Sequence, residues 1–587
     1  MTVADRTGAP GRLTRLLDAA RRPNGVFCLL LAAVLGVLVL APITGLVATT
    51  LQGEGPEAWR QVLASELSPN LFWEPLLWTL LLGVTVAAGG TVLGATMAWL
   101  VVVTDLPMRG LLGFLATIPF VLPSFAIALA WETVFRNDLV GGRVGLLQDL
   151  GFDVPNLLAW GFVPVAVTLI SHYYSLSFAL IAAALSSVGA DLMEAGEMTG
   201  ASKARVAFGI TLPVVTPAVV AGALLCFAEG VSSFAVPQLL GLPVGFQTLS
   251  TRLYGAISTG QIERGYVLSV LILLVAAAVL LAANRFTGGR RSFATMSGKG
   301  VRRRRLPLGR WRWPAFALAA ALCLATAVLP MLVLLASSFA RKTNSLLGGF
   351  TAHFWIGASD PRFAQGQEGV LRNPQIFEAT WNTILLGLVV ALCAAFLGLA
   401  VGYVAVRLRG NPLAGLVSVL GFVPFLVPGI AFGAAYIAQF GAQIGPIPSL
   451  YGTFAMLVIA GAAFSLPFAA QSGRASVSQV SNDLEEAATV AGAGFSRRMG
   501  RIVLPLTARS MIAGSVLVFV NIVRDISLVI LLVTPATPLL SVLTFGYAAE
   551  GFAQFANAIT VVIAFVCVGT TLLARRLQGA TQPWEDE

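Results

Sequence analysis

Charged residues are scarce in this chain. Only 11% of its 587 residues are Asp, Glu, Lys or Arg, whereas 57% are hydrophobic. A typical soluble domain carries about 25% charged residues. The apolar residues also gather in long blocks, and a bilayer core needs roughly 20 apolar residues for each helical span. The composition excludes an ordinary soluble domain and predicts an all-α polytopic membrane protein.

Cysteine and histidine are equally sparse. The five cysteines lie in apolar blocks without metal-ligand spacing, and there are two histidines. Cysteines in such blocks are typical of small core residues, so the sequence indicates neither a disulfide framework nor a metal site. His172 lies within an apolar block, and we interpret it as a helix–helix hydrogen-bonding residue. A membrane-embedded enzyme would need a cluster of His, Asp, Glu or Cys that the sequence does not provide.

The basic residues account for a net charge of +10. They precede the first apolar block, follow the last one, and fill residues 285–312 in the middle of the chain. Such clusters mark cytoplasmic loops and are attracted to anionic lipid headgroups. We interpret them as topology signals rather than as a nucleic-acid surface, and we predict that both termini are cytoplasmic.

The apolar blocks predict twelve transmembrane helices, six in each half of the chain. Their approximate ranges are 25–48, 74–103, 110–135, 157–187, 214–236, 265–284, 313–338, 380–406, 412–438, 451–473, 506–533 and 555–575.

The two halves are related in sequence. Thr79 and Gly94 match Thr383 and Gly398 at one constant offset. Because six is an even number of spans, both halves enter the membrane in the same sense, which makes this a parallel repeat. The predicted organisation is a first half at 1–284, a basic cytoplasmic linker at 285–312 and a second half at 313–587.

One polar pattern occurs in each half, at 188–213 and at 480–505, on the predicted cytoplasmic side. Corresponding positions differ by 292 residues throughout. The first copy comprises Glu194, Ala195, Gly196, Gly200, Leu212 and Pro213, and the second comprises Glu486, Ala487, Ala488, Gly492, Leu504 and Pro505.

The spacing of this pattern predicts a short helix–turn–helix. An acidic residue opens each copy, where it favours the start of a helix, and a glycine follows as a candidate helix C-cap. The proline marks the return into the membrane. The simpler alternative is a pair of ordinary amphipathic loops that are alike only because the gene was duplicated.

Both copies resemble the EAA loop of ATP-binding cassette import permeases, which reads Glu-Ala-Ala, a glycine six positions after the Glu, then Ile-x-Leu-Pro. The first copy departs from it with Gly196 in the third place. The resemblance implies a fused permease of the type I importer fold in a bacterial plasma (inner) membrane. It also implies that the two loops are coupling helices, which dock into a cleft on each of two ATPase subunits.

The chain contains no Gly-x-x-x-x-Gly-Lys-Ser/Thr loop to hold ATP phosphates. The resemblance therefore implies that ATP and Mg²⁺ are bound by the partner ATPases and that an extracytoplasmic binding protein delivers the cargo. No cofactor is expected in this chain.

Polar residues inside spans are costly and usually face a cavity. The predicted translocation path lies sixteen to twenty-two residues past each re-entry proline, roughly 24–33 Å from the cytoplasmic face at about 1.5 Å per residue. This distance predicts a position near the outer mouth. The alternative is interfacial or structural contact. The path residues are Glu229, Ser232, Ser233, Asn521, Arg524, Asp525 and Ser527.

The cargo is indicated only by resemblance. Residues 525–532 with Pro535, and Pro237 with residues 240–243, resemble the single-chain ferric-iron importers. Thiamine, polyamine and phosphonate importers share much of this pattern and stay open as alternatives. A secondary transporter also has twelve spans, but it would need a coupling-ion site and would not need paired EAA loops.

Overall fold

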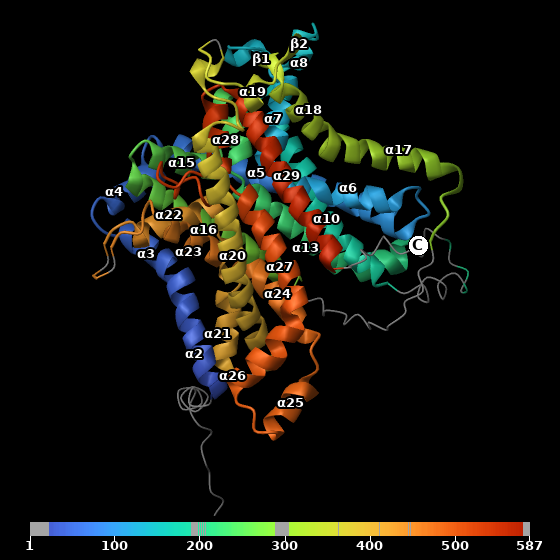
Figure 1. The fold of residues 1–587 in the computed structure, drawn as a ribbon, viewed down its shortest axis with the longest axis vertical. Coiled ribbons are helices and arrows are strands. Elements are labelled where there is room, and N and C mark those ends of the chain that lie inside the picture. Colours follow the sequence, from blue (N-terminus) through green and yellow to red (C-terminus); the bar gives the residue numbers. More distant parts are fainter. Residues whose placement is uncertain are drawn as a thin grey trace, which may run out of the picture. The chain divides into compact units, whose positions relative to one another are not determined.

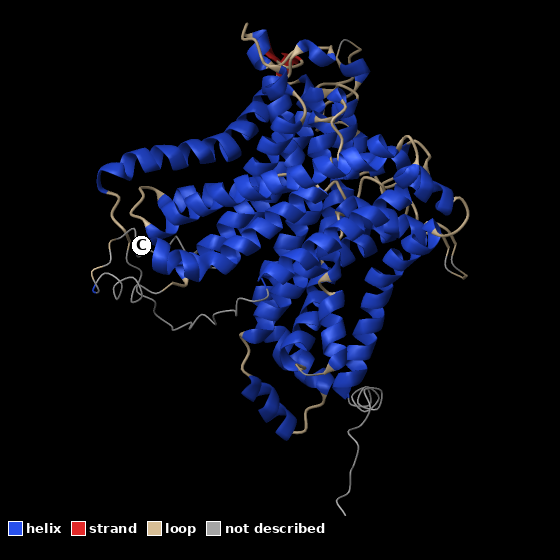
Figure 2. Ribbon diagram, turned by 180° about the vertical axis from the view of Figure 1, so that it is seen from behind, coloured by secondary structure: helices blue, strands red, loops and turns tan. Residues whose placement is uncertain are grey.

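The computed structural model describes residues 23–188, 198, 200, 202, 205, 207–287, 305–361, 363–409, 411–443, 445–446 and 448–578. These residues are almost entirely helical, with one two-stranded antiparallel sheet among them (Figures 1 and 2). The sheet joins β1 (Ala340–Lys342) to β2 (Ser345–Phe350).

The helices before the basic linker are bounded as follows, with η denoting a short 3-10 or π segment: α2 (Pro23–Leu35), η1 (Gly36–Leu40), α3 (Ala41–Thr50), α4 (Gly55–Ala64), η2 (Pro69–Trp73), α5 (Glu74–Ala98), η3 (Trp99–Val103), α6 (Arg109–Val121), α7 (Ser124–Phe135), η4 (Asp138–Val140), α8 (Leu146–Asp149), α9 (Asn156–Ala159), α10 (Phe162–Ser186), η5 (Ala207–Thr211), α13 (Leu212–Ser232), α14 (Ala235–Leu240), η6 (Leu242–Val244), α15 (Leu249–Ser258) and α16 (Ile262–Thr287).

Those after it are η7 (Gly309–Trp311), α17 (Arg312–Cys323), η8 (Leu324–Val328), α18 (Leu329–Ser338), α19 (His353–Ile356), η9 (Ala364–Gly366), α20 (Pro374–Arg407), α21 (Pro412–Leu420), η10 (Val423–Leu426), α22 (Gly429–Phe440), α23 (Phe454–Phe464), α24 (Leu466–Ser478), α25 (Asn482–Val490), α26 (Phe495–Arg498), η11 (Met499–Val503), α27 (Leu504–Arg524), α28 (Leu540–Ala549) and α29 (Ala553–Gln578).

The described helices confirm the predicted membrane fold. Nine are long and apolar enough to cross a membrane, and three bent pairs raise the number to twelve when each pair counts as one span. All twelve coincide with the predicted apolar blocks. The eleventh is shorter than predicted, since α27 ends at Arg524 rather than near residue 533.

Three spans predicted as continuous helices are broken. The chain bends by 94° between α6 and α7 and by 112° between η10 and α22. Pro123 and Pro428 stand at these two breaks. Proline lacks an N–H and clashes with the preceding helical turn, so it ends the first helix. The third break, of 53°, separates α23 from α24 just before Pro467.

The described chain divides into two compact units, and the first span of each half is grouped with helices of the other half. One unit holds residues up to Leu46 together with Leu385–Phe425 and Ala435–Ile522, and the other holds the remainder. In the first unit, α2 packs against α21 in a core that contains Cys28, Leu35 and Val417. In the second unit, α17 joins the core of α5, α6 and α10 through Cys323.

The repeat is also visible in equivalent hydrogen bonds of the second unit. Thr79 accepts a hydrogen bond at Oγ1 from the Leu249 backbone N–H, at 2.9 Å. The matched Thr383 accepts one from the Leu540 N–H, also at 2.9 Å. Each bond ties a long helix, near its start, to the start of a helix that follows the EAA segment of the same half.

Two matched glycines allow close helix packing. A Cβ on Gly94 of α5 would lie 2.7 Å from the Phe178 backbone nitrogen of α10, and a Cβ on Gly398 of α20 would overlap the Ala469 backbone of α24. Neither position therefore has room for a larger residue.

Candidate functional site: coupling segments and a buried polar cluster

The second EAA segment forms the predicted helix–turn–helix. Ser481 caps α25, its hydroxyl accepting a hydrogen bond from the Asp483 N–H at 3.2 Å. Gly492 ends this helix with a φ of +79°, a left-handed conformation that favours glycine. The Ala493 N–H then donates back to the Ala488 carbonyl at 2.9 Å, as in a glycine-terminated helix end. α26 follows, and Leu504 begins membrane helix α27.

A glutamate outside the predicted set, Glu485, fixes this segment to a membrane helix. Glu485 is 4% exposed and forms an ion pair with Arg407 of α20, at 2.9 Å. The Tyr403 hydroxyl donates a hydrogen bond to the same carboxylate at 2.8 Å. Glu486 is exposed and accepts a hydrogen bond from Asn482 within α25.

The outer surface of α25 carries exposed apolar and small side chains. Val490 is 91% exposed and Leu484 is 48% exposed. Ala487 is also exposed, and nothing lies within 4 Å of a Cβ built on Gly492. This surface combines apolar side chains with small residues that leave space for a second protein.

The first segment is described only in part. Glu194, Ala195 and Gly196 lie outside the described residues. Gly200 has a φ of +83°, like Gly492, and Leu212 begins α13 with Pro213 in its first turn. Met198 is 87% exposed and stands 292 residues before Val490, so both segments present an apolar side chain at the same position.

Arg524, one of the predicted path residues, lies at the break in the third span. Its guanidinium donates to the carbonyls of Phe120 and Leu122, the second at 3.3 Å, and lies 4.0 Å from the centre of the Phe120 ring. A helix that ends at a proline leaves carbonyls without intrahelical partners. Arg524 satisfies two of them with a positive charge.

Further polar side chains gather around Arg524 in the same compact unit. Its Nη1 lies 3.5 Å from His172 Nε2, and Glu229 interacts electrostatically with Arg524 and with Asp525. Tyr173 also interacts electrostatically with Glu229. The structure thus brings together Glu229, Arg524 and Asp525, which the sequence predicted for the path, and adds His172 and Tyr173.

This polar cluster lies beside the middle of α10. His172 is near the middle of the span Asn156–Ser186, and the backbone at Gly230 approaches Val86 and Gly83, well inside α5. The cluster therefore lies closer to the midpoint of α10 than to either of its ends.

The other predicted path residues take different positions. Ser232 is the last residue of α13, and Ser233, 5% exposed, follows it. Asn521 lies one turn before Arg524 in α27. Ser527 belongs to a turn in which Asp525 accepts a hydrogen bond from the Leu528 N–H at 2.9 Å.

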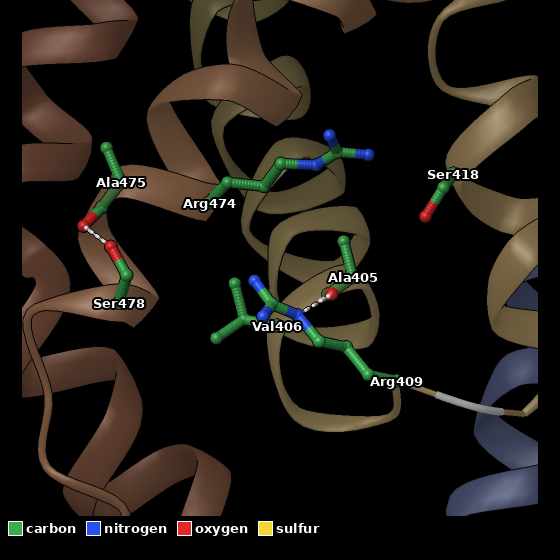
Figure 3. Close-up of a pocket in the computed structure, with 7 residues that line it drawn as sticks. All are labelled: Ala405, Val406, Arg409, Ser418, Arg474, Ala475 and Ser478. Carbon is green, nitrogen blue, oxygen red and sulfur yellow. Dashed lines mark hydrogen bonds between the residues drawn. The ribbon is translucent and has the colours of Figure 1, made fainter. Parts of the chain in front are cut away.

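A separate basic groove lies between α20, α21 and α24, with a volume of about 420 Å³. Figure 3 shows Arg474 extending from α24 toward Ser418 of α21, while Arg409 lies beside the Ala405 carbonyl. Its lining contains no carboxylate and none of the predicted site residues.

The described residues contain no group of three or more His, Cys, Asp or Glu side chains able to hold a metal ion. The features that stand out in the described part of the chain are the second EAA segment and the polar cluster around Arg524.

Sequence reasoning missed several residues that the structure makes prominent. Glu485 stands immediately before the motif. Its position on the helix turns it toward Arg407, whereas the next residue, Glu486, is exposed. Met198 and Val490 could have been found from the sequence, because each stands two positions before the glycine of its EAA segment. Tyr173 had no signal beyond its place inside a span.

A duplicated six-span unit with an EAA-like segment in each half is typical of a transport permease. The chain matches the family described as binding-protein-dependent transport system inner membrane component over residues 90–290 and again over 394–584. The chain belongs to this family and carries its domain twice, which confirms the predicted fused permease.

The chain is similar to two ferric permeases. It is 25% identical to a putative ferric transport system permease protein of Haemophilus influenzae, over 72% of this chain and 64% of the relative. It is 24% identical to a ferric transport system permease protein of Actinobacillus pleuropneumoniae, over 72% and 59%. The chain thus spans about 60% of these relatives' lengths.

A shorter relative is named for a different cargo. The putative 2-aminoethylphosphonate transport system permease protein of Salmonella typhimurium is 27% identical over 43% of this chain and 86% of its own length. These relatives are permeases, which are not themselves enzymes, as the sequence predicted for this chain.

Proposed function

We propose that this chain is the translocating subunit of an ATP-driven importer whose cargo is ferric iron. The observation that supports it most directly is the second coupling segment. A helix with exposed apolar side chains, Leu484 and Val490, is fixed to the membrane domain by the buried Glu485–Arg407 pair. Such a helix can both dock into a partner and transmit its movement.

The partners are two ATPase subunits and an extracytoplasmic binding protein. Each coupling segment offers one docking position, with Met198 or Val490 as its exposed apolar side chain. Exposed apolar side chains of this kind mark protein interaction sites. With both termini cytoplasmic, the coupling segments face the ATPases, and the external loop at about 340–379 faces the binding protein.

In this proposal the docking surface is formed by both EAA loops. Its residues are Glu194, Ala195, Gly200, Leu212 and Pro213 in the first loop, and Glu486, Ala487, Ala488, Gly492, Leu504 and Pro505 in the second. Glu229, Arg524 and Asp525 line the translocation path, with Ser232, Ser233, Asn521 and Ser527 around them. Closure of the ATPase dimer pulls the coupling segments together and changes the access of this path.

The docking role is tested with the purified chain reconstituted in proteoliposomes with its ATPase and binding protein. Val490→Asp should abolish stable ATPase association and ATP-dependent uptake, because a charge would be buried at the interface. Val490→Leu, which keeps an apolar side chain, is the matched control and should retain both. Wild-type ATPase binding and uptake by the Asp variant would refute the proposal.

The cargo is tested in the same vesicles with radioactive ferric iron. ATP-dependent iron accumulation is expected. The named phosphonate relative supports 2-aminoethylphosphonate as the competing cargo, and accumulation of that compound without iron would overturn the iron assignment. Uptake that continues without ATP and without an associated ATPase would identify a secondary transporter instead.

A further inference from the structure

A second polar site lies away from the coupling segments and the polar cluster. A cavity of about 440 Å³ opens between the end of α7, the loop after it, the β1–β2 hairpin and the start of α29. All of these segments belong to one compact unit. Figure 1 shows α7, β1 and α19 close together at the top of the view. In the predicted topology, this is the extracytoplasmic side.

The lining of this cavity is positively charged. The cavity is lined by Arg136, Arg143 and Arg341, and Glu132 is the only carboxylate among the described lining residues. Glu132 is already paired with Arg136 at 2.6 Å. Within the described part of the chain, no acidic side chain forms an ion pair with Arg143 or Arg341, so two positive charges are left to attract an anion.

Three buried polar atoms in the lining have no hydrogen-bond partner: Nε of Arg136 and the amide oxygens of Asn344 and Asn557. Asn557 is 1% exposed and Asn344 is 6% exposed. The Asn557 amide nitrogen donates to Ser337 at 2.6 Å, which fixes the orientation of this side chain. An unsatisfied buried polar atom costs about 1–3 kcal/mol, and such atoms require an explanation.

These atoms define the chemistry of an occupant. The arginines require oxygen acceptors with negative charge, whereas the two amide oxygens require hydrogen-bond donors. We propose that this cavity binds a small oxyanion that also carries hydroxyl or amino hydrogens. A hydroxycarboxylate is the simplest member of this class, and the volume is sufficient for one such molecule.

The test uses the full-length chain in lipid nanodiscs with two matched ligands. Citrate carries three carboxylates and a hydroxyl, and tricarballylate is the same molecule without the hydroxyl. Calorimetric titration should show saturable citrate binding and at least about fivefold weaker tricarballylate binding, since one hydrogen bond contributes about 1 kcal/mol. Equal binding of the two would contradict the donor requirement, and no saturable binding of citrate would overturn the proposal.

Variants then locate the site. Arg341→Ala should weaken citrate binding about tenfold, as expected for loss of a charge-assisted hydrogen bond. Arg372→Ala removes an exposed arginine of the same loop that does not line the cavity, and it should bind like wild type. Equal loss in both variants would indicate general charge attraction and would refute a defined site. Because binding is measured without ATPase or transport, this result is independent of the proposed importer function.

Discussion

Glu485 and Arg407 form a buried ion pair that joins coupling helix α25 to membrane helix α20, with 2.9 Å between Oε1 and Nε. Their side chains are only 6% and 13% exposed. A displacement of α25 must therefore move the inner end of α20 or separate two buried charges. At the equivalent position, 292 residues earlier, the first repeat has Met193, so the sequence provides this ionic connection in one repeat only.

Removing one member of this pair should destabilise the protein. Arg407→Met leaves the Glu485 carboxylate buried without its cation, which typically costs about 3–5 kcal/mol. A lower thermal unfolding midpoint in detergent, together with reduced uptake per ATP hydrolysed, is expected.

The double variant Arg407→Met/Glu485→Leu is the control. An apolar replacement of both partners is often neutral, so the double variant should recover much of the thermal stability while coupling stays impaired. Stability of the single variant equal to wild type would show that the ion pair contributes nothing.

Arg524 should resist conservative replacement. Its guanidinium contacts two carbonyls and the Phe120 ring at once, whereas lysine offers a compact point charge that does not fit this planar arrangement. We expect Arg524→Lys to lower the thermal unfolding midpoint relative to wild type, and Arg524→Met to lower it more than Arg524→Lys does. Arg509→Met, at an exposed position of the same helix, should have little effect, and equal midpoints in all variants would contradict the anchoring role.

The charges of Glu229 and Asp525 should matter for transport. Glu229→Gln and Asp525→Asn keep the side-chain shapes and remove one charge each. Uptake should fall by at least about tenfold in each, while detergent-stable assembly with the ATPase is unchanged. The exposed Glu263 provides the control as Glu263→Gln. Normal uptake with normal assembly would show that the cluster does not line the path.

Two glycines of the second half should respond oppositely to alanine. Gly398→Ala inserts a methyl group against the Ala469 backbone, and such overpacking costs about 1–3 kcal/mol. Gly415→Ala has nothing within 4 Å and removes a helical glycine, which is worth roughly 0.5–1 kcal/mol. Thermal unfolding should therefore show a decrease for the first and no decrease for the second; a reversed order would contradict the close packing of α20 and α24.

Much of the architecture could be predicted from sequence, because span length and the paired motif depend on local composition and spacing. The breaks could not. A span with an internal proline can kink or end, and neighbours such as Arg524 decide which. The eleventh span shows the same limit, since Asp525 accepts a backbone hydrogen bond from Leu528 and turns the chain out of the helix.

The candidate site was predicted by residue type better than by position. The motif identifies the coupling segment, but which of two adjacent glutamates is buried depends on how α25 is rotated against Arg407. The gathering of His172, Tyr173 and Glu229 around Arg524 depends on long-range packing that no local pattern encodes.

The grouping of each first span with helices of the other half has a consequence for biogenesis. The other segments of the compact unit that contains α2 begin at Leu385, so α2 meets these partners only after much of the second half has been synthesised. Contacts this distant in sequence form late, and exposed intermediates are prone to misassembly. The first span therefore stays in the bilayer without these partners during synthesis. Truncated chains that end before Leu385 should be degraded rather than accumulate as a folded half.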